Sequence, residues 1–257
     1  MRYYLFYNYF IMKIKKWDAY LWDCLEIMDS LIEQWIQVDA IITDPPYWTT
    51  ACKWDQIIPF DKMRERLNKL IKPNWAIVLF ANEPFTSTLI CSNLKWFKYR
   101  IDWNKIIPSW MSYAKYRPMS QIEDICIFTK YWEKSIYNPQ MIKRDKPIKS
   151  WWMWNSLSAM TVWYKPLNKA YEFKNPTTLI EFDKIRKDSL HPTQKPVALI
   201  EYLVKTYTNE WEMVLDFTAG SFTTAIACEN TNRKRICIEK DEWYYNIWIE
   251  RVNGDTK

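Results

Sequence analysis

Short apolar runs alternate with amphipathic segments along most of this 257-residue chain. The runs at 38–43, 76–81 and 213–218 have the length and composition of buried strands. In 24–33 and 60–71 the apolar residues recur three and four positions apart, which is typical of helices packed on a sheet. Further strands are predicted at 18–23, 99–106, 124–130 and 235–239, and further helices at 85–92, 197–207, 223–229 and 243–252. This alternation predicts an α/β fold with a doubly wound, mostly parallel sheet.

The periodicity fades between 131 and 188, where proline, lysine and asparagine predominate and no helix is predicted. That stretch holds 11 Lys and Arg against 6 Asp and Glu, so it carries most of the chain's net charge of +6. A shorter basic and aromatic loop is predicted at 113–119. The length suits one domain with an insertion, and the charge makes an anionic partner plausible.

The inventory of histidine and cysteine disfavours several classes of site. There is one histidine, and the six cysteines show no metal-ligand spacing, so neither a metal site nor a Ser-His-Asp triad is expected. Free thiols suit a reducing cytoplasm. The aromatic N-terminus is too short to span a bilayer. We expect translation to begin at Met12 and residues 1–11 to be an extra segment.

The strand predicted at 38–43 ends abruptly at Asp44, Pro45, Pro46 and Tyr47. Two prolines cannot continue a strand, and Pro45 holds Asp44 in an extended conformation. The result is a rigid turn at the carboxyl end of a strand, where open α/β sheets bind ligands. Its carboxylate, backbone carbonyls and aromatic face suit a planar nitrogen heterocycle with an amino group. An ordinary Asp-Pro-Pro turn remains the alternative on this segment alone.

A second strand and turn lie near the C-terminus. The strand at 213–218 contains Asp216, and a turn of small residues with Gly220 leads into a helix. Backbone N–H groups at the start of that helix can bind a polar ligand. The next strand ends at Glu239, about 20 residues later, where an acid binds ribose hydroxyls in nucleoside-binding folds. The turn lacks the GxGxxG pattern, so a dinucleotide is not indicated, and a plain turn remains the alternative.

Three motifs occur together in a characteristic order: TDPPY at 43–47, HPTQKP at 191–196 and LDFTAGSFTTAIAC at 215–228. In this order they resemble the amino-group DNA methyltransferases of the β class, which methylate adenine N6 at specific sites. The resemblance implies a Rossmann-like S-adenosylmethionine-dependent fold with circularly permuted motifs. Its catalytic half would be 12–130 and its cofactor half 189–257. The stretch 131–188 between them would be an inserted target-recognition region.

The resemblance also implies roles for individual residues. Asp44, Pro45, Pro46 and Tyr47 would be catalytic and hold the target base. The residues that would bind S-adenosylmethionine are Asp23, Cys24, Thr193, Lys195, Asp216, Phe217, Thr218, Ala219, Gly220, Ser221 and Glu239. Of these, Glu239 would bind the ribose, Asp23 and Cys24 would approach the adenine, and Thr193 and Lys195 would lie near the methionine end. Lys143, Arg144, Lys146 and Lys149 would contact double-stranded DNA.

The same resemblance gives a mechanism. An exocyclic amine is a poor nucleophile because its lone pair is delocalised into the ring. The Asp44 carboxylate and the Pro45 carbonyl would accept both N–H bonds and favour a pyramidal nitrogen, which then attacks the sulfonium methyl in line. Catalysis would come mainly from positioning and desolvation, with Tyr47 stacked on a base that has left the duplex. No Pro-Cys dipeptide is present, which disfavours a cytosine-C5 mechanism.

Several alternatives stay open. Methylation of the cytosine 4-amino group is the first, although enzymes of that kind more often carry Ser in place of Asp44. A DNA-binding relic without activity is the second. Methylation of RNA or of protein amides is weaker, since those families usually show Asn-Pro-Pro-Tyr. The resemblance leaves open a homodimer and a cognate restriction endonuclease as partners.

The composition contains one anomaly, 17 Trp beside 2 Gly, where average usage would give about 18 Gly. Trp75 and Trp211 occupy turns that favour a positive φ, and Trp22 and Trp48 stand where the family has glycine. Taken literally, Trp22 and Trp48 would obstruct the site, and Phe222, where a second glycine is usual, would pack over the cofactor. We therefore hypothesise that most of the tryptophans are glycines encoded by UGA; a chain that is genuinely rich in tryptophan is the alternative. The positions concerned are 22, 48, 75, 110, 151, 152, 154, 163, 211 and 248.

Overall fold

The computed structural model describes residues 19–48, 56–130, 135–149, 170–187 and 189–253. They form two compact units, Pro139–Thr177 and the remainder of the chain. The smaller unit falls inside the stretch where the sequence pattern loses its periodicity. The predicted extra segment at 1–11 lies outside the described residues.

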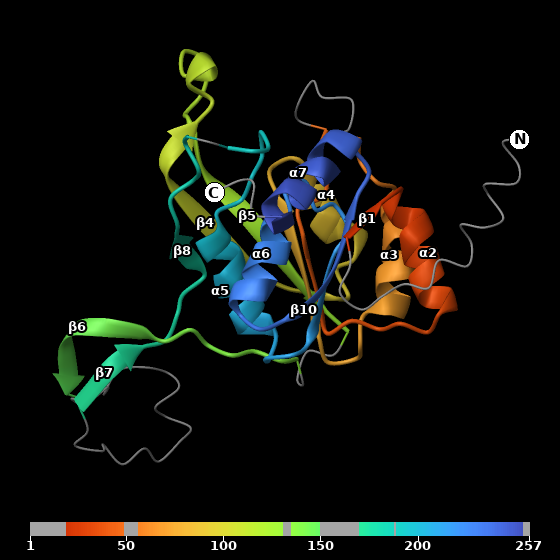
Figure 1. The fold of residues 1–257 in the computed structure, drawn as a ribbon. Coiled ribbons are helices and arrows are strands. Elements are labelled where there is room, and N and C mark those ends of the chain that lie inside the picture. The colour runs from red at the N-terminus through yellow and green to blue at the C-terminus, as the bar shows by residue number, and fades with distance from the viewer. Residues whose placement is uncertain (1–18, 49–55, 131–134, 150–169, 188, 254–257) are drawn as a thin grey trace, which may run out of the picture. The chain divides into compact units, whose positions relative to one another are not determined.

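The larger unit is built on a sheet of eight described strands (Figure 1). Five neighbouring strands are parallel, β5 is antiparallel to both β3 and β4, and β8 pairs in parallel with β4 at the edge. In spatial order the strands are β1 (Ala19–Leu21), β10 (Lys234–Glu239), β9 (Met213–Asp216), β2 (Ala40–Thr43), β3 (Ala76–Ala81), β5 (Ser120–Thr129), β4 (Phe97–Ser109) and β8 (Leu179–Glu181). The predicted mostly parallel sheet is confirmed.

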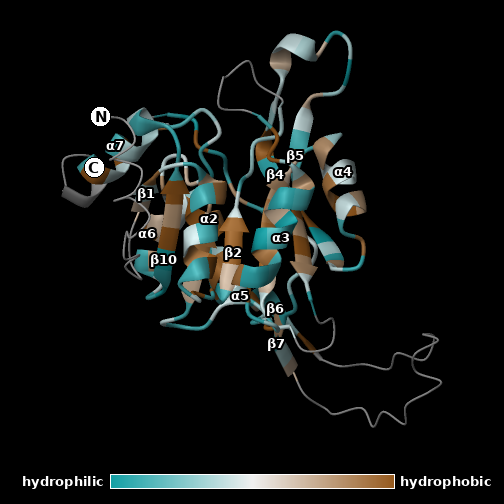
Figure 2. Cartoon of the chain, turned by 90° about the vertical axis from the view of Figure 1, so that its right-hand side faces the viewer, coloured by the Kyte–Doolittle hydropathy of each residue, from teal (hydrophilic) through white to brown (hydrophobic). Residues whose placement is uncertain are grey.

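Helices cover both faces of this sheet because its central strands are apolar on both sides. Ile41 and Leu79 point into one core with α2 (Cys24–Glu33), α3 (Phe60–Leu70) and α4 (Phe85–Ser92). Ile42 and Val78 point into the opposite core with α5 (Val197–Tyr207) and α6 (Thr223–Asn230). Figure 2 shows α2 and α3 in front of the brown strands with their teal residues turned outward. The doubly wound arrangement is therefore confirmed.

The C-terminal helix α7 (Glu242–Asn253) packs on β1 and β10, and its Trp248 belongs to a third apolar cluster with Phe222. None of the described helices combines the length and apolar character needed to cross a membrane.

The strands β4 and β5 extend further than their apolar runs predict. Their outer ends form a long antiparallel hairpin whose tip carries a short 3-10 turn at Met111–Tyr113. At this tip the Arg117 guanidinium lies over the rings of Trp110 and Tyr113, at 5.2 and 5.8 Å from their centroids. The hairpin ends have exposed faces, so the apolar alternation that marks a strand in sequence is missing there.

The smaller unit contains β6 (Ile142–Lys149) paired antiparallel with β7 (Ala170–Lys174). All four predicted DNA-binding residues belong to β6. Lys143 and Lys146 are exposed, and the Arg144 side chain donates to the carbonyl of Phe173 at 3.3 Å. The hairpin thus displays basic side chains to solvent.

Seven described residues other than glycine have a positive φ, and four of them are tryptophans. Trp35, Trp48, Trp110 and Trp211 have φ of 56°, 59°, 71° and 68°. The positive φ predicted for Trp211 is confirmed. For Trp75 it is wrong: this residue is absent from the positive-φ group, and its side chain packs partly buried against a core cluster. The tryptophans at 151, 152, 154 and 163 lie outside the described residues.

Candidate active site

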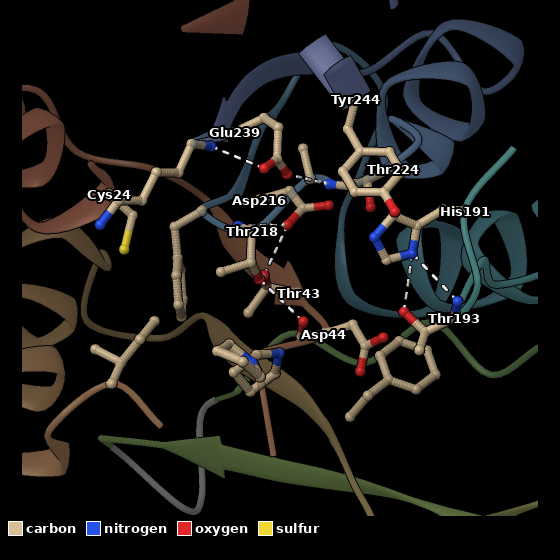
Figure 3. Close-up of a pocket in the computed structure, with 18 of the residues that line it drawn as sticks. Cys24, Thr43, Asp44, His191, Thr193, Asp216, Thr218, Thr224, Glu239 and Tyr244 are labelled. Atoms are coloured by element: carbon tan, nitrogen blue, oxygen red, sulfur yellow. Dashed lines mark hydrogen bonds between the residues drawn. The ribbon is translucent and has the colours of Figure 1, made fainter. Parts of the chain in front are cut away.

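A cavity of about 350 Å³ opens at the carboxyl ends of the parallel strands, within the larger unit (Figure 3). Every predicted catalytic and cofactor-binding residue lines it, although these residues come from segments far apart in the sequence. The set comprises Asp23, Cys24, Asp44, Pro45, Pro46, Tyr47, Thr193, Lys195, Asp216, Phe217, Thr218, Ala219, Gly220, Ser221 and Glu239. The fold therefore brings the three sequence motifs to one place.

Two neighbouring strands hold the Asp-Pro-Pro turn against the glycine turn. The Thr43 hydroxyl, at the end of β2, donates to Asp216 at the end of β9 over 2.7 Å. It also lies 2.6 Å from the Thr218 hydroxyl, which donates to the backbone carbonyl of Asp44 at 3.1 Å. These bonds fix the position of the Asp44 backbone relative to the second turn, as the dashed lines in Figure 3 show.

The Asp44 carboxylate accepts hydrogen bonds on both of its oxygens. The Tyr47 hydroxyl donates to Oδ1, and the Lys195 ammonium donates to Oδ2 at 2.5 Å. Burial, together with the charges of Asp44 and Glu123, raises the pKa of Tyr47 well above its ordinary value, so its hydroxyl remains a donor. The Tyr47 ring also packs on Phe85, with centroids 5.1 Å apart. A carboxylate has about four lone-pair sites, so capacity remains for a further donor.

Gly220 occupies the tightest point of the second turn. Its φ is +51°, and a Cβ there would meet the His191 ring at 3.6 Å. Its N–H donates to Glu239 Oε2 at 2.7 Å, while the N–H groups of Lys240 and Asp241 donate to Oε1 at 2.8 Å each. Burial raises the pKa of Glu239 despite these donors. The glycine turn is thus hydrogen-bonded to the carboxylate at the end of β10.

Asp216 is a buried acid between the two turns, with 4% of its surface exposed. Burial raises its pKa to about 6, although bonds from Thr224, Thr43 and the Thr218 N–H oppose the shift. The result is a carboxyl group able to change its protonation near neutral pH.

The loop before α2 forms another side of the cavity. Asp23 caps that helix by accepting from the Leu25 N–H at 3.0 Å, and its other oxygen accepts from Lys240 at 3.0 Å. Burial raises the pKa of Cys24 to about 12, so its thiol remains protonated. Trp22 also lines the cavity, as its predicted position beside Asp23 implies.

His191, the single histidine of the chain, lies between Thr193 and Tyr244. Its Nδ1 accepts from the Thr193 N–H at 3.2 Å, and its ring centroid lies 4.1 Å from that of Tyr244. Burial and the nearby Lys195 charge lower its pKa to about 4, so the ring is neutral at physiological pH. Tyr244 was not anticipated from the sequence, because a tyrosine in an amphipathic helix gives no signal of a contact with a distant histidine.

Two expectations about bulky residues are wrong. Phe222 does not lie over the cavity: its side chain is fully buried and packs on Tyr245 and Trp248 of α7. Its φ of 61° reverses the chain at this point and directs the ring into that cluster. Trp48 follows the catalytic turn but is absent from the cavity lining, and 75% of it is exposed.

The described residues contain no group of three or more histidine, cysteine or acidic side chains arranged to hold a metal ion. Among the described residues, the polar groups that line the cavity include carboxylates, hydroxyls, the ammonium groups of Lys195 and Lys240, the His191 ring and backbone groups.

The chain resembles known proteins over most of its length. The profile of a DNA methylase family matches residues 38–250. The type II methyltransferase M.HpaI of Haemophilus parainfluenzae is 28% identical over 85% of this chain and 69% of its own length. The DNA adenine methyltransferase YhdJ of Escherichia coli (strain K12) is 29% identical over 84% of this chain and 76% of its own.

Solved structures give the same result. The M1.HpyAVI complex with S-adenosylmethionine aligns with a TM-score of 0.62 and 27% identity, over 91% of this chain and 98% of that one. The cytosine-N4-specific PvuII DNA methyltransferase has a TM-score of 0.60 over 93% of this chain and 94% of that one. At 16% identity the latter similarity establishes the fold alone. With the matched profile spanning most of the chain, this protein belongs to the N6/N4 DNA methylase family.

Proposed function

We propose that this chain is a site-specific DNA methyltransferase that transfers a methyl group from S-adenosylmethionine to the N6 amine of adenine. The observation that carries the proposal is the Asp44 carboxylate, held at the end of β2 in the same cavity as the glycine turn and Glu239. A base-binding carboxylate and a nucleoside-binding turn thus share one cavity, as transfer between two ligands requires.

The polar groups that line the cavity are suited to bind S-adenosylmethionine. Glu239 accepts three backbone N–H bonds, so about one lone-pair site remains to accept from a ribose hydroxyl. Asp23 lies nearby, because the Lys240 that follows Glu239 donates its ammonium to Asp23. Gly220 adopts the positive φ that this turn needs, and the absence of a Cβ leaves space between the turn and the His191 ring. When bound, the cofactor supplies an electrophilic methyl group on a positively charged sulfonium.

The residues of this chain would bind and orient the target amine. The Asp44 carboxylate and the Pro45 carbonyl accept its two N–H bonds, which localises the nitrogen lone pair toward the methyl group. The bond from Thr218 to the Asp44 backbone fixes where these acceptors lie relative to the glycine turn. Catalysis then depends on positioning and on exclusion of water rather than on a covalent intermediate.

Adenine is favoured over cytosine by the Asp at position 44, where cytosine-N4 enzymes more often carry Ser. The relative YhdJ is named an adenine methyltransferase, and it matches 84% of this chain. The basic strand β6, with Lys143, Arg144 and Lys146, supplies a surface suited to the phosphates of double-stranded DNA. Lys149 ends that strand. The Type III restriction-modification enzyme EcoPI Mod subunit of Escherichia phage P1 is 41% identical over 32% of this chain, which supports a cognate endonuclease as a partner.

The experiment is methylation of genomic DNA from a methylase-deficient bacterium with methyl-labelled S-adenosylmethionine. After digestion, mass spectrometry identifies the labelled nucleoside. Label in N6-methyldeoxyadenosine supports the proposal. Label in N4-methyldeoxycytidine would assign the cytosine alternative, and no label in DNA despite cofactor binding would contradict both.

A further inference from the structure

A buried cluster of charges surrounds the catalytic turn, and one of its members, Glu123, has no role in the site described so far. Glu123 lies on β5, and its Oε1 forms an ion pair with the Lys195 ammonium at 2.8 Å. The same ammonium donates to Asp44 at 2.5 Å. We propose that Glu123 is a positioning residue, which holds Lys195 in place so that Lys195 fixes the Asp44 carboxylate for the target amine. This inference rests on the proposed function.

The ammonium is surrounded by groups that favour its charge. It donates to Asp44 Oδ2 and to the Thr193 carbonyl at 3.5 Å, forms an ion pair with Glu123, and lies 5.0 Å from the Phe80 ring centroid. The Lys195 side chain is only 9% exposed, so a bare charge there would be costly. The position of the ammonium is therefore set by its protein partners rather than by water.

The arrangement of the strands places Glu123 close to Lys195. β5 is antiparallel to β3, and Asp124, the residue after Glu123, is in register with Ala81 at the end of β3. Glu123 thus lies beside the carboxyl ends of the parallel strands, where the cavity opens. Its other oxygen is 3.8 Å from Lys105 of β4, which places a second cation behind it.

Glu123 therefore acts on Asp44 chiefly through Lys195, the cation that both acids contact. If its charge is lost, the ammonium keeps one carboxylate partner and can leave the position that orients Asp44 Oδ2. A misplacement of about 1 Å in a catalytic group can lower a rate by about 100-fold. Glu239 and Asp23, which would bind the ribose and the adenine of the cofactor, are not members of this cluster, so we expect cofactor binding to persist when Glu123 is replaced.

Titratable groups from several elements face Lys195: Asp44 from the turn after β2, Glu123 from β5, Lys105 from β4 and His191 from the loop before α5. Tyr47 in turn faces Asp44 and Glu123. Burial disfavours the Lys195 charge, but Asp44 and Glu123 outweigh it and raise its pKa. Removing Lys195 would leave two carboxylates in one partly buried site without the cation that lies between them.

The test starts from the Glu123→Gln variant, which retains shape and a hydrogen-bond acceptor but not the charge. We expect kcat to fall by about 10- to 100-fold while the Kd for S-adenosylmethionine stays within about twofold. The matched control is Glu181→Gln, an exposed glutamate on β8 that bonds Asn104, which should keep wild-type kcat. Circular dichroism and thermal unfolding verify that each variant is folded.

A double-mutant cycle then tests whether the effect passes through Lys195. In a Lys195→Ala background, Glu123→Gln should lower kcat little further. Additive losses, or a Glu123→Gln variant with wild-type kcat, would overturn the inference. A wild-type enzyme without any DNA methylation would refute the proposed function instead.

Discussion

Trp35 and Trp211 are the residues at which glycine should increase stability most clearly. Both have a positive φ, 56° and 68°, and their side chains are 93% and 62% exposed, so little packing is lost on removing them. A residue with a Cβ pays about 1–2 kcal/mol for the left-handed conformation. Glycine adopts it freely but loses about 0.5–1 kcal/mol more conformational entropy on folding.

The balance favours glycine by roughly 1 kcal/mol at each of these two positions. The Trp35→Gly/Trp211→Gly variant should therefore gain about 2 kcal/mol, which corresponds to a rise in Tm of about 4–8 °C for a chain of this size. Urea unfolding should show a higher midpoint with an unchanged m-value. The glycine hypothesis names position 211 and so predicts a UGA codon there; the positive φ of Trp35 extends the same expectation to position 35.

The matched control is Trp243→Gly. Trp243 is 74% exposed but lies in α7 without a positive φ, so glycine should give no gain there and a loss of up to about 1 kcal/mol. A double variant with an unchanged or lower Tm would contradict both the glycine hypothesis and the backbone argument on which it rests.

Three further predictions concern the site and the DNA surface. Asp44→Ala should abolish methyl transfer while S-adenosylmethionine binding survives at least in part, and retained turnover of labelled methyl groups would refute the role of Asp44. Replacing Lys143, Arg144 and Lys146 with alanine should weaken DNA binding and lower the log–log salt slope by roughly 0.9 for each phosphate that the variant no longer neutralises; an unchanged slope would place the DNA elsewhere. The ring protons of His191, the single histidine, should titrate by NMR near pH 4 in the folded protein. Because that pKa is below the ordinary 6.5, the contribution of the neutral ring to the free energy of unfolding is fully present above pH 6.5 and is lost as the pH falls through 4. A titration midpoint near 6.5 would contradict the buried neutral ring.

The sequence predicted the central elements well because their residues are buried on both faces. A short, continuous apolar run such as that of β3 is typical of a strand covered on both sides by helices. The hairpin ends of β4 and β5, and strands β6 to β8, escaped prediction because they bury little apolar surface. Their backbone pairing leaves no periodic signature in the side chains.

The candidate site was predictable where a motif places a residue at the end of a strand. Asp44, Asp216 and Glu239 all fall there, and all three line the cavity. The contact between Glu123 and Lys195 joins residues 72 positions apart, on β5 and before α5, and only the folded sheet brings them together. Phe222 was misplaced because its positive φ directs the ring away from the cavity, which a motif comparison does not reveal.

Methylation of adenine at a specific DNA sequence is the activity on which the roles proposed for Asp44, Lys195 and Glu123 depend. The most direct measurement is single-molecule sequencing of genomic DNA from a methylase-deficient bacterium that expresses the wild-type protein, beside the same strain expressing Asp44→Ala. We expect N6-methyladenine at one recurrent sequence in the first strain and none in the second. Methylation on cytosine, or a wild-type pattern indistinguishable from that of Asp44→Ala, would contradict this assignment.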